Sequence, residues 1–293
     1  MDDVARLIQL VINGAASGCI YGLIAFGFVL IYKATEMVNF AQGEIMMLGA
    51  FAAYTCVHSF GMNYWAGFAI AIAATAAFGF LLDAVVLRRV IGQPQFAVVM
   101  LTLGLAFIFR AAAGLAWGYD SVGFETPFTN RNLKFGWLVL GADNVSIIVG
   151  TVILCAVLYV FFSRTRLGIA MQAASQNQLA AYYMGIPVRM VFSLIWAISA
   201  GVAAFAAVLL SPVSLIDVNM GFLGIKAFAA AVLGGFGSIP GALIGGVIVG
   251  VVEQLSGYFL PPGFQDVTSN VVLLAVLILR PQGLFGMTIR KRV

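Results

Sequence analysis

Residues 7–32, LIQLVINGAASGCIYGLIAFGFVLIY, form a run without a single Asp, Glu, Lys or Arg. A helix needs about 20 predominantly apolar residues to cross the hydrocarbon core of a bilayer, which is about 30 Å thick. This stretch is long enough, and its apolar residues surround the helix instead of covering one face. It therefore predicts a helix that spans a membrane.

The rest of the chain repeats this pattern. Further charge-free runs occupy 45–82, 90–109, 144–163, 190–216 and 227–252, and a shorter apolar run lies at 267–279. Only 9% of the 293 residues are charged, against about 25% in a soluble domain. A soluble helical bundle would need polar helix faces, and barrel strands would alternate in segments of about ten residues. We expect an all-α polytopic membrane protein that forms a single transmembrane domain over residues 1–293.

Basic residues in short loops set the expected orientation, because Lys and Arg accumulate on the cytoplasmic side. They gather at three places: Arg88 and Arg89; Arg164, Arg166 and Arg189; and the C-terminal end from Arg280. The predicted spans are 8–32, 42–59, 65–87, 95–117, 144–163, 190–211, 220–236, 241–260 and 266–281, with a hinge near Ser59–Asn63. This gives about nine transmembrane helices, with eight to ten open, an external N-terminus and a cytoplasmic C-terminus.

Several classes of function lack the residues that they need. None of the four lysines is followed by Ser or Thr, so the chain has no GxxxxGK[ST] loop to bind a nucleotide phosphate. His58 is the only histidine, which excludes a two-histidine zinc motif, and the three cysteines lie scattered in apolar runs. No catalytic residue, metal ligand or cofactor is expected. The chain is either a conduit by itself or the membrane subunit of a machine that another chain powers.

The N-terminus and the net charge of the chain suggest two further expectations. The N-terminus lacks the basic region and the cleavage pattern of a signal peptide, so the first span is expected to be retained. The formal net charge is +4, but the basic residues are spread over loops, as membrane orientation requires, and predict no nucleic-acid partner.

The segment Asn39-Phe40-Ala41-Gln42-Gly43-Glu44 places polar groups at the start of an apolar helix. In one interpretation it is a broken helix that lines a translocation path, with Asn39, Gln42, Gly43 and Glu44 as candidates. In the other it is a cytoplasmic turn in which Asn39 caps the next helix and Glu44 lies in its first turn. Both interpretations stay open.

The loop 164–187 is long for the cytoplasmic side, and its polar cluster Ser175–Gln178 divides two Ala- and Leu-rich stretches. This pattern predicts helix, turn and helix, and Gly185 followed by Pro187 is a signal for a helix C-terminus. A short surface helix of this kind fits a groove on a partner protein. A simple interfacial amphipathic helix is the alternative.

The segment 232–246 holds seven Gly or Pro residues and cannot form one uninterrupted helix. Its backbone either lines a wet cavity, with Gly235, Gly237 and Ser238 as candidates for a translocation path, or allows tight helix packing. Among the other charges near the spans, Arg110 is expected to extend outward, and Lys226 and Glu253 are candidates for an ion pair.

Five ordered segments resemble the permease subunits of high-affinity branched-chain amino acid ABC importers, on the smaller, LivH-like side. They are Gly18–Ala25, Asn39–Glu44 with Met47–Ala50, the loop 165–186, Gly234–Gly241 and Arg280–Gly286. The resemblance implies a second homologous permease, two cytoplasmic ATPases that bind ATP and Mg, and a periplasmic binding protein, all at a bacterial inner membrane.

The same resemblance implies that the cytoplasmic loop is a coupling helix that docks on the ATPase. The candidates are Arg166, Gly168, Ala173, Ala174, Gln176, Asn177, Ala181, Gly185 and Ile186. The acidic residue that opens the general importer consensus is absent, since Gln172 precedes Ala173. The implied function is import of branched-chain or other hydrophobic amino acids by alternating access. Urea, short amides or aromatic acids are alternative cargoes, and a secondary transporter or channel is the alternative from another class.

Overall fold

The computed structural model describes residues 2–90, 92–129, 131–135, 138–261, 263–280 and 282–286. Its helices are α1 (Asp2–Thr35), α2 (Gln42–Tyr54), α3 (Tyr64–Val85), α4 (Gln95–Trp117), α5 (Ala142–Arg164), α6 (Arg166–Gln176), α7 (Gln178–Tyr183), α8 (Val188–Leu210), α9 (Leu223–Gly234), α10 (Ile239–Phe259) and α11 (Phe264–Leu279). A π-helical turn (Thr55–Ser59) extends α2, and short 3₁₀ turns lie at Leu87–Arg89 and Met220–Phe222.

Within the described residues, six helices are long and apolar enough to cross a membrane. They are Arg6–Thr35, Tyr64–Arg89, Gln95–Trp117, Ala142–Arg164, Val188–Leu210 and Ile239–Phe259. The helical polytopic fold is thus confirmed, and the chain is a multi-pass membrane protein. The other three predicted spans coincide with shorter helices, α2, α9 and α11, of 13, 12 and 16 residues. The count of nine stays a prediction.

Two predicted breaks in the helices are confirmed. The run 45–82 divides where the π-helical turn ends, and Asn63 then starts α3 by accepting a hydrogen bond from the Trp65 amide at 3.0 Å. The glycine-rich run divides at 235–238, where Gly235 has a φ of +93° and Ser238 caps α10. One element was not predicted: β1 (Asn132–Phe135) and β2 (Leu138–Gly141) pair antiparallel within the loop before α5.

Helix α1 lies at the centre of the bundle and packs against α10 over much of its length. The two helices approach closely at glycines, because a β-carbon on Gly18 would lie 2.6 Å from the Cα of Val247. A β-carbon on Gly246 would meet the backbone of Gly22. Tight glycine packing, one of the two interpretations of the glycine-rich segment, is therefore present along α10, and the break at 235–238 occurs beside it.

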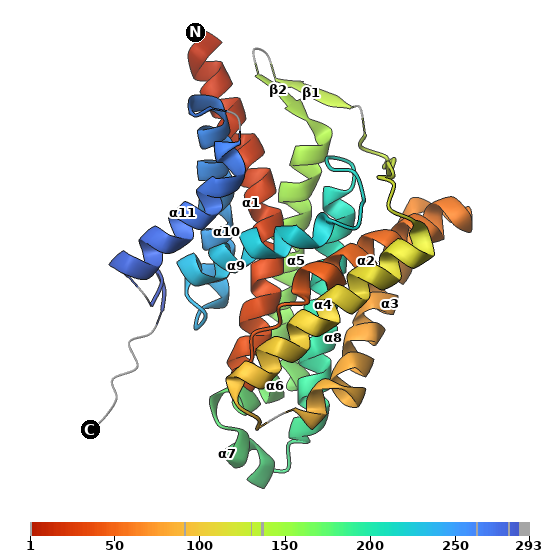
Figure 1. Ribbon diagram of the computed structural model, residues 1–293, viewed down its shortest axis with the longest axis vertical. Helices are drawn as coiled ribbons and strands as arrows, with labels where there is room; N and C mark the ends of the chain where they lie inside the picture. Colours follow the sequence, from red (N-terminus) through yellow and green to blue (C-terminus); the bar gives the residue numbers. More distant parts are fainter. Residues whose placement is uncertain are drawn as a thin grey trace.

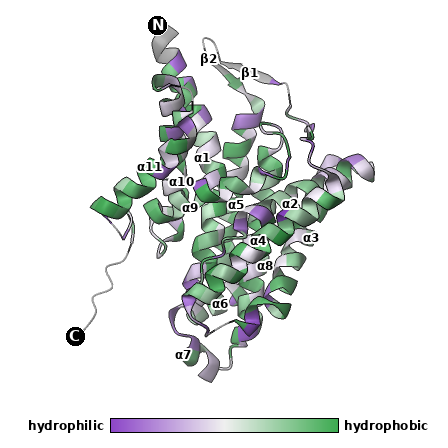
Figure 2. Cartoon of the chain, in the orientation of Figure 1, coloured by the Kyte–Doolittle hydropathy of each residue, from purple (hydrophilic) through white to green (hydrophobic). Residues whose placement is uncertain are grey.

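The ends of the molecule differ in character (Figure 1). The start of α1 and the β1–β2 hairpin lie at one end of the longest axis, and α7 lies at the other. Hydrophobic residues dominate the helices between them, and hydrophilic segments gather around α7 (Figure 2). Most residues of α1 and α8 are buried, whereas only a minority of the residues of α4 and α5 are buried.

Candidate functional site

The chain folds back between α1 and α2, so that α2 begins deep inside the bundle. Residues 37–39 have no regular secondary structure, and a β-carbon on Gly27 would lie 2.7 Å from the Ser199 hydroxyl and would meet the Gln42 amide. Gly27 lies eight residues before the end of α1, which is about 12 Å along the helix. Ser199 lies in the middle of α8. The segment Asn39–Glu44 therefore turns back into the bundle, and we call it the re-entrant segment. Whether it lines a translocation path or forms a cytoplasmic turn stays a prediction.

Hydrogen bonds hold the re-entrant segment against α8. The Gln42 amide donates to the Ser199 carbonyl at 3.3 Å, and the Ser199 hydroxyl donates to Gln42 Oε1 at 3.2 Å. Asn39 donates to the same Oε1 at 3.1 Å and accepts from the Ala41 amide at 3.1 Å. The interpretation as a turn expected Asn39 to cap α2. The cap residue is instead Ala41. Asn39 and Gln42 thus fix the backbone where α2 starts.

The start of α2 meets the start of α9 at this depth. Gly43 packs against the backbone of Gly221 and Gly224, in the 3₁₀ turn and first turn that lead into α9. The packing leaves no room for a side chain at Gly43, since a β-carbon there would overlap the Gly221 carbonyl. Glu44 then projects from the first turn of α2, with 4% of its surface exposed.

Glu44 forms an ion pair with Arg110 of α4. The Arg110 Nη2 and Glu44 Oε1 atoms lie 2.5 Å apart, and the side chains are 22% and 6% exposed. The Arg110 guanidinium also lies over the Phe222 ring, 4.1 Å from its centroid. Arg110 was expected to extend outward; it instead turns inward to the carboxylate, because an ionisable group at this depth is stabilised by an opposite charge.

A cavity of about 360 Å³ opens beside this pair. Its walls come from α1, the start of α2 with Phe40 before it, α4, the 3₁₀ turn before α9, and α9 itself. The charged residues in its lining are Glu44 and Arg110, and its aromatic residues are Phe28, Phe40, Phe107, Phe222 and Phe228. Of the four path candidates in the re-entrant segment, Glu44 alone lines this cavity. We call it the Glu44–Arg110 cavity.

A second buried ion pair joins α9 to α10. Lys226 Nζ and Glu253 Oε1 lie 2.6 Å apart, and the side chains are 19% and 7% exposed. The sequence raised this pairing as a possibility, and the structure confirms it. Neither residue lines the Glu44–Arg110 cavity.

The other path candidates lie at the opposite end of α9 from Glu44. Gly235 is buried beside Gly283, whereas Gly237 is exposed and Ser238 caps α10. Rings connect the two places, since Phe228 lies 5.5 Å from Phe40 and 5.7 Å from Phe236 between ring centroids. The structure therefore does not bring the two sets of candidates into one site. Contacts between aromatic rings connect the two places.

The predicted helix–turn–helix in the loop 164–187 is confirmed as α6 and α7. Asn177 lies between them and caps α7 by accepting from the Ala180 amide at 2.9 Å. Gly185 follows α7 with a φ of +81°, and the Ile186 amide donates back to the Ala181 carbonyl at 3.0 Å. This is the left-handed helix end that the Gly185 signal predicted.

The coupling candidates divide by exposure. Arg166, Gln176, Asn177 and Gly185 are exposed, Ala173 and Ile186 are intermediate, and Gly168, Ala174 and Ala181 are buried. The sequence-based prediction missed the large apolar side chains that α7 and its C-terminus present. They are Leu179, Tyr182, Tyr183 and Met184, each at least 67% exposed. Their signal was available in the sequence, because several large apolar residues close together in a loop that is expected to be cytoplasmic indicate a binding surface.

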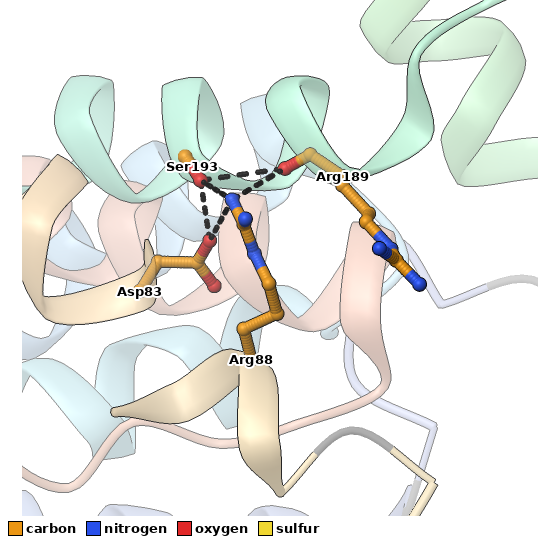
Figure 3. A network of polar contacts seen from close by, with 4 residues as sticks. All are labelled: Asp83, Arg88, Arg189 and Ser193. Carbon is orange, nitrogen blue, oxygen red and sulfur yellow. Dashed lines mark hydrogen bonds and ion pairs between the residues drawn. The ribbon is translucent and has the colours of Figure 1, made fainter. Parts of the chain in front are cut away.

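A polar network holds the start of α8 against α3 (Figure 3). Ser193 donates to Asp83 Oδ2 at 2.6 Å and accepts from Arg88 Nη2 at 2.8 Å. Arg88 also reaches the Arg189 carbonyl at 3.4 Å. Asp83 is 1% exposed, so these contacts stabilise a carboxylate that burial disfavours.

These features together define a class of protein. A helical bundle with several spans, a re-entrant segment and buried charges beside a cavity is the architecture of a membrane permease. The family model described as branched-chain amino acid transport system / permease component matches residues 10–280, and the chain belongs to that family.

Curated relatives match nearly the whole chain. The permease protein BraD of a high-affinity branched-chain amino acid transport system from Pseudomonas aeruginosa is 34% identical, with 98% of both chains covered. LivH of Escherichia coli, named for the same kind of system, is 33% identical with 95% of both chains covered. LivM of the same organism is 26% identical and covers 92% of this chain and 68% of its own.

One solved structure shares the fold. A chain of PsaBC from Streptococcus pneumoniae in complex with Fab has a TM-score of 0.52 and 14% sequence identity. The match covers 95% of this chain and 97% of that chain. At this identity the likeness shows a common fold alone.

Proposed function

We propose that this chain is the membrane permease subunit of an ATP-driven, binding-protein-dependent importer of branched-chain or other hydrophobic amino acids. The observation that carries the proposal is the family match over residues 10–280, together with BraD at 34% identity over 98% of both chains. In this proposal residues 1–293 form one transmembrane permease domain, and ATP and Mg bind to partner subunits instead of this chain.

The proposed complex contains a second permease subunit, two cytoplasmic ATPases and a periplasmic binding protein. The similarity to both LivH and LivM of one organism supports a pair of related permeases. The basic residues of the short loops support an external N-terminus and a cytoplasmic C-terminus in a bacterial inner membrane. The separation of the start of α1 from α7 along the longest axis accords with that orientation (Figure 1).

In this proposal α6 and α7, within residues 164–187, couple the permease to an ATPase. The exposed apolar side chains of α7 supply a surface for docking. Gln178 donates to the Ala34 carbonyl of α1 at 3.0 Å, and Gln172 donates to the Phe162 carbonyl of α5 at 3.1 Å. A push on α7 would therefore reach the central helix α1, and alternating access follows when ATP binding to the partners favours one arrangement of the helices.

The proposal is tested by reconstitution. The chain is co-expressed with a second permease and ATPase subunits of the same kind of system, purified through one tag, and placed in proteoliposomes with a binding protein. We expect two ATPase subunits to co-purify and leucine uptake to require ATP. Uptake that persists without ATPases would support a secondary transporter instead, and a complex that takes up urea, short amides or aromatic acids but not leucine would correct the cargo.

The docking surface has a separate test. Replacing Tyr183 and Met184, both 82% exposed, by Ala should lower the amount of ATPase that co-purifies at least about fivefold, since exposed aromatic anchors dominate such interfaces. Tyr159→Ala on α5 is the matched control, because Tyr159 is 74% exposed and lies outside α7. Equal retention of ATPase in both variants would remove α7 from the docking surface.

A further inference from the structure

We infer that the Glu44–Arg110 cavity is a binding station for the zwitterionic headgroup and apolar side chain of an amino acid. In this station Glu44 faces the ammonium group and Arg110 faces the carboxylate. The inference rests on the proposed function, since it assumes that an amino acid passes through this chain. It adds a specific site on the path, built from α2, α4 and the start of α9.

The first support is the cost of the ion pair where it lies. Arg110 belongs to the span Gln95–Trp117 and keeps 22% of its side chain exposed, next to an open cavity. Its Nε atom is buried and has no hydrogen-bond partner among the described residues. A charge that faced lipid at this depth would be strongly disfavoured, and intramembrane charges face a wet cavity or the interior of a bundle. The face of α4 that carries Arg110 therefore borders the path instead of lipid.

The second support is the match between the charges and the cargo. An amino acid zwitterion carries one positive and one negative group, and the cavity wall carries one of each. Exchange of the internal pair for two pairs with the ligand keeps every charge opposed, so no uncompensated charge is created during binding. Arg suits the carboxylate because its planar fork presents several donors in one plane.

The third support is the apolar wall. Phe40, Phe107 and Phe228 line the cavity together with Leu103 and Ile225. A volume of about 360 Å³ lies at the lower end of the range of about 300–1,000 Å³ for sites of small ligands. An aliphatic side chain fits such a wall, whereas a strongly polar one would lose its hydrogen bonds to water.

The alternative is that the pair only joins α2 to α4. The chain holds a control for this alternative, because Lys226 and Glu253 form a pair of nearly equal length and burial away from this cavity. A purely structural role predicts that the two pairs respond alike to neutralisation.

The test is protection of a cysteine by ligand in the assembled transporter. Ile225 lines the cavity and is 52% exposed, so Ile225→Cys is labelled with a maleimide after Cys19, Cys56 and Cys155 are replaced by Ala. Val271→Cys on α11, at a position 56% exposed, is the control. Labelling is measured with and without ATP and vanadate, in the presence of leucine, 3-methylbutylamine or 4-methylpentanoate.

We expect leucine to slow the labelling of Ile225→Cys but not of Val271→Cys. Each analogue lacks one charge and should need at least about tenfold higher concentration, because it loses one charge-assisted contact. When Glu44→Gln and Arg110→Gln are combined with Ile225→Cys, protection should also need at least about tenfold more leucine. Combining Lys226→Gln and Glu253→Gln with Ile225→Cys should leave the protecting concentration of leucine unchanged.

Three results would overturn the inference. They are no labelling of Ile225→Cys either with or without ATP and vanadate, labelling that leucine does not slow, or protection by both analogues as strong as by leucine. The failure of the proposed function is distinct from these. It is a wild-type complex that takes up no amino acid, whereas a complex that imports leucine without protecting Ile225→Cys rejects the station alone.

Discussion

Two regions of the molecule solve the same electrostatic problem in different surroundings. The pair Glu44–Arg110 joins α2 to α4 at 2.5 Å, and the pair Lys226–Glu253 joins α9 to α10 at 2.6 Å. Exposure of the four side chains is nearly matched, at 6% and 22% against 7% and 19%. The first pair borders an aromatic cavity, and the second lies where α9 meets the glycine-packed helix α10.

A buried charge pair is therefore not by itself evidence of a binding site. Both pairs satisfy the need of an intramembrane charge for an opposite charge. The two pairs differ in two respects: the Glu44–Arg110 pair has space for a ligand beside it, and its positive residue is an arginine instead of a lysine. Arg110 offers a planar set of donors for a carboxylate, whereas Lys226 offers a compact charge.

The largest effects are expected when one member of either pair is neutralised. Glu44→Gln leaves the Arg110 charge facing a neutral amide, and Glu253→Gln removes the carboxylate that lies 2.6 Å from Lys226 Nζ. Removing one partner of a buried pair costs about 3–5 kcal/mol. We expect both single variants to lose most of their folded yield and to melt at lower temperature in detergent.

The double variants are the controls for these single changes. Glu44→Gln with Arg110→Gln, and Lys226→Gln with Glu253→Gln, remove both charges and should regain most of the folded yield. If a single variant melts like the wild type, its pair contributes little to stability, and the two pairs are not equivalent as structural elements.

A smaller effect is expected from the packing that distinguishes the α10 region. Gly246→Ala adds a β-carbon against the backbone of Gly22, which has no flexible side chain to move away. Overpacking of this kind costs about 1–3 kcal/mol, measured as a lower midpoint of thermal unfolding. Gly104→Ala on α4 is the control, because nothing lies within 4 Å of the added β-carbon. A gain of stability at both positions would contradict close packing of α1 and α10.

The smallest effect is expected at the network of Figure 3, where a buried carboxylate has several contacts instead of one. Ser193→Ala removes the donor to Asp83 but leaves Arg88 at 3.9 Å, so the expected loss is about 1 kcal/mol. Ser214→Ala removes only a weak hydrogen bond to the Leu215 carbonyl at 3.4 Å, so it should change the midpoint of unfolding by much less. A loss at Ser193 as large as that of Glu44→Gln would show that Arg88 does not compensate.

The positions of the helices were largely predictable, because composition alone determines where a chain can lie in a bilayer. The predicted span 95–117 coincides with α4 (Gln95–Trp117), and the break at 59–63 and the two helices of the loop 164–187 are confirmed. The depth at which α2 starts was not predictable, because it depends on hydrogen bonds between Gln42 and Ser199, 157 residues further along the chain.

The candidate site was predictable in part. Glu44 was recognised as an ionisable group beside a span, but its partner Arg110 lies 66 residues away and no local pattern links them. Lys226 and Glu253 were considered as a pair because they were among the few charges within or beside the predicted spans. The cavity itself could not be foreseen, since it depends on how α2, α4 and the start of α9 converge in space.

Side-by-side uptake by the two double variants distinguishes a binding role for Glu44 and Arg110 from a purely structural one. Reconstituted with their partners, Lys226→Gln with Glu253→Gln should import leucine within about twofold of the wild type. Glu44→Gln with Arg110→Gln should fall at least about tenfold, since each lost charge-assisted contact weakens binding by about that factor. Equal uptake by the two variants, each assembled with its ATPases, would contradict a role for Glu44 and Arg110 in binding the cargo.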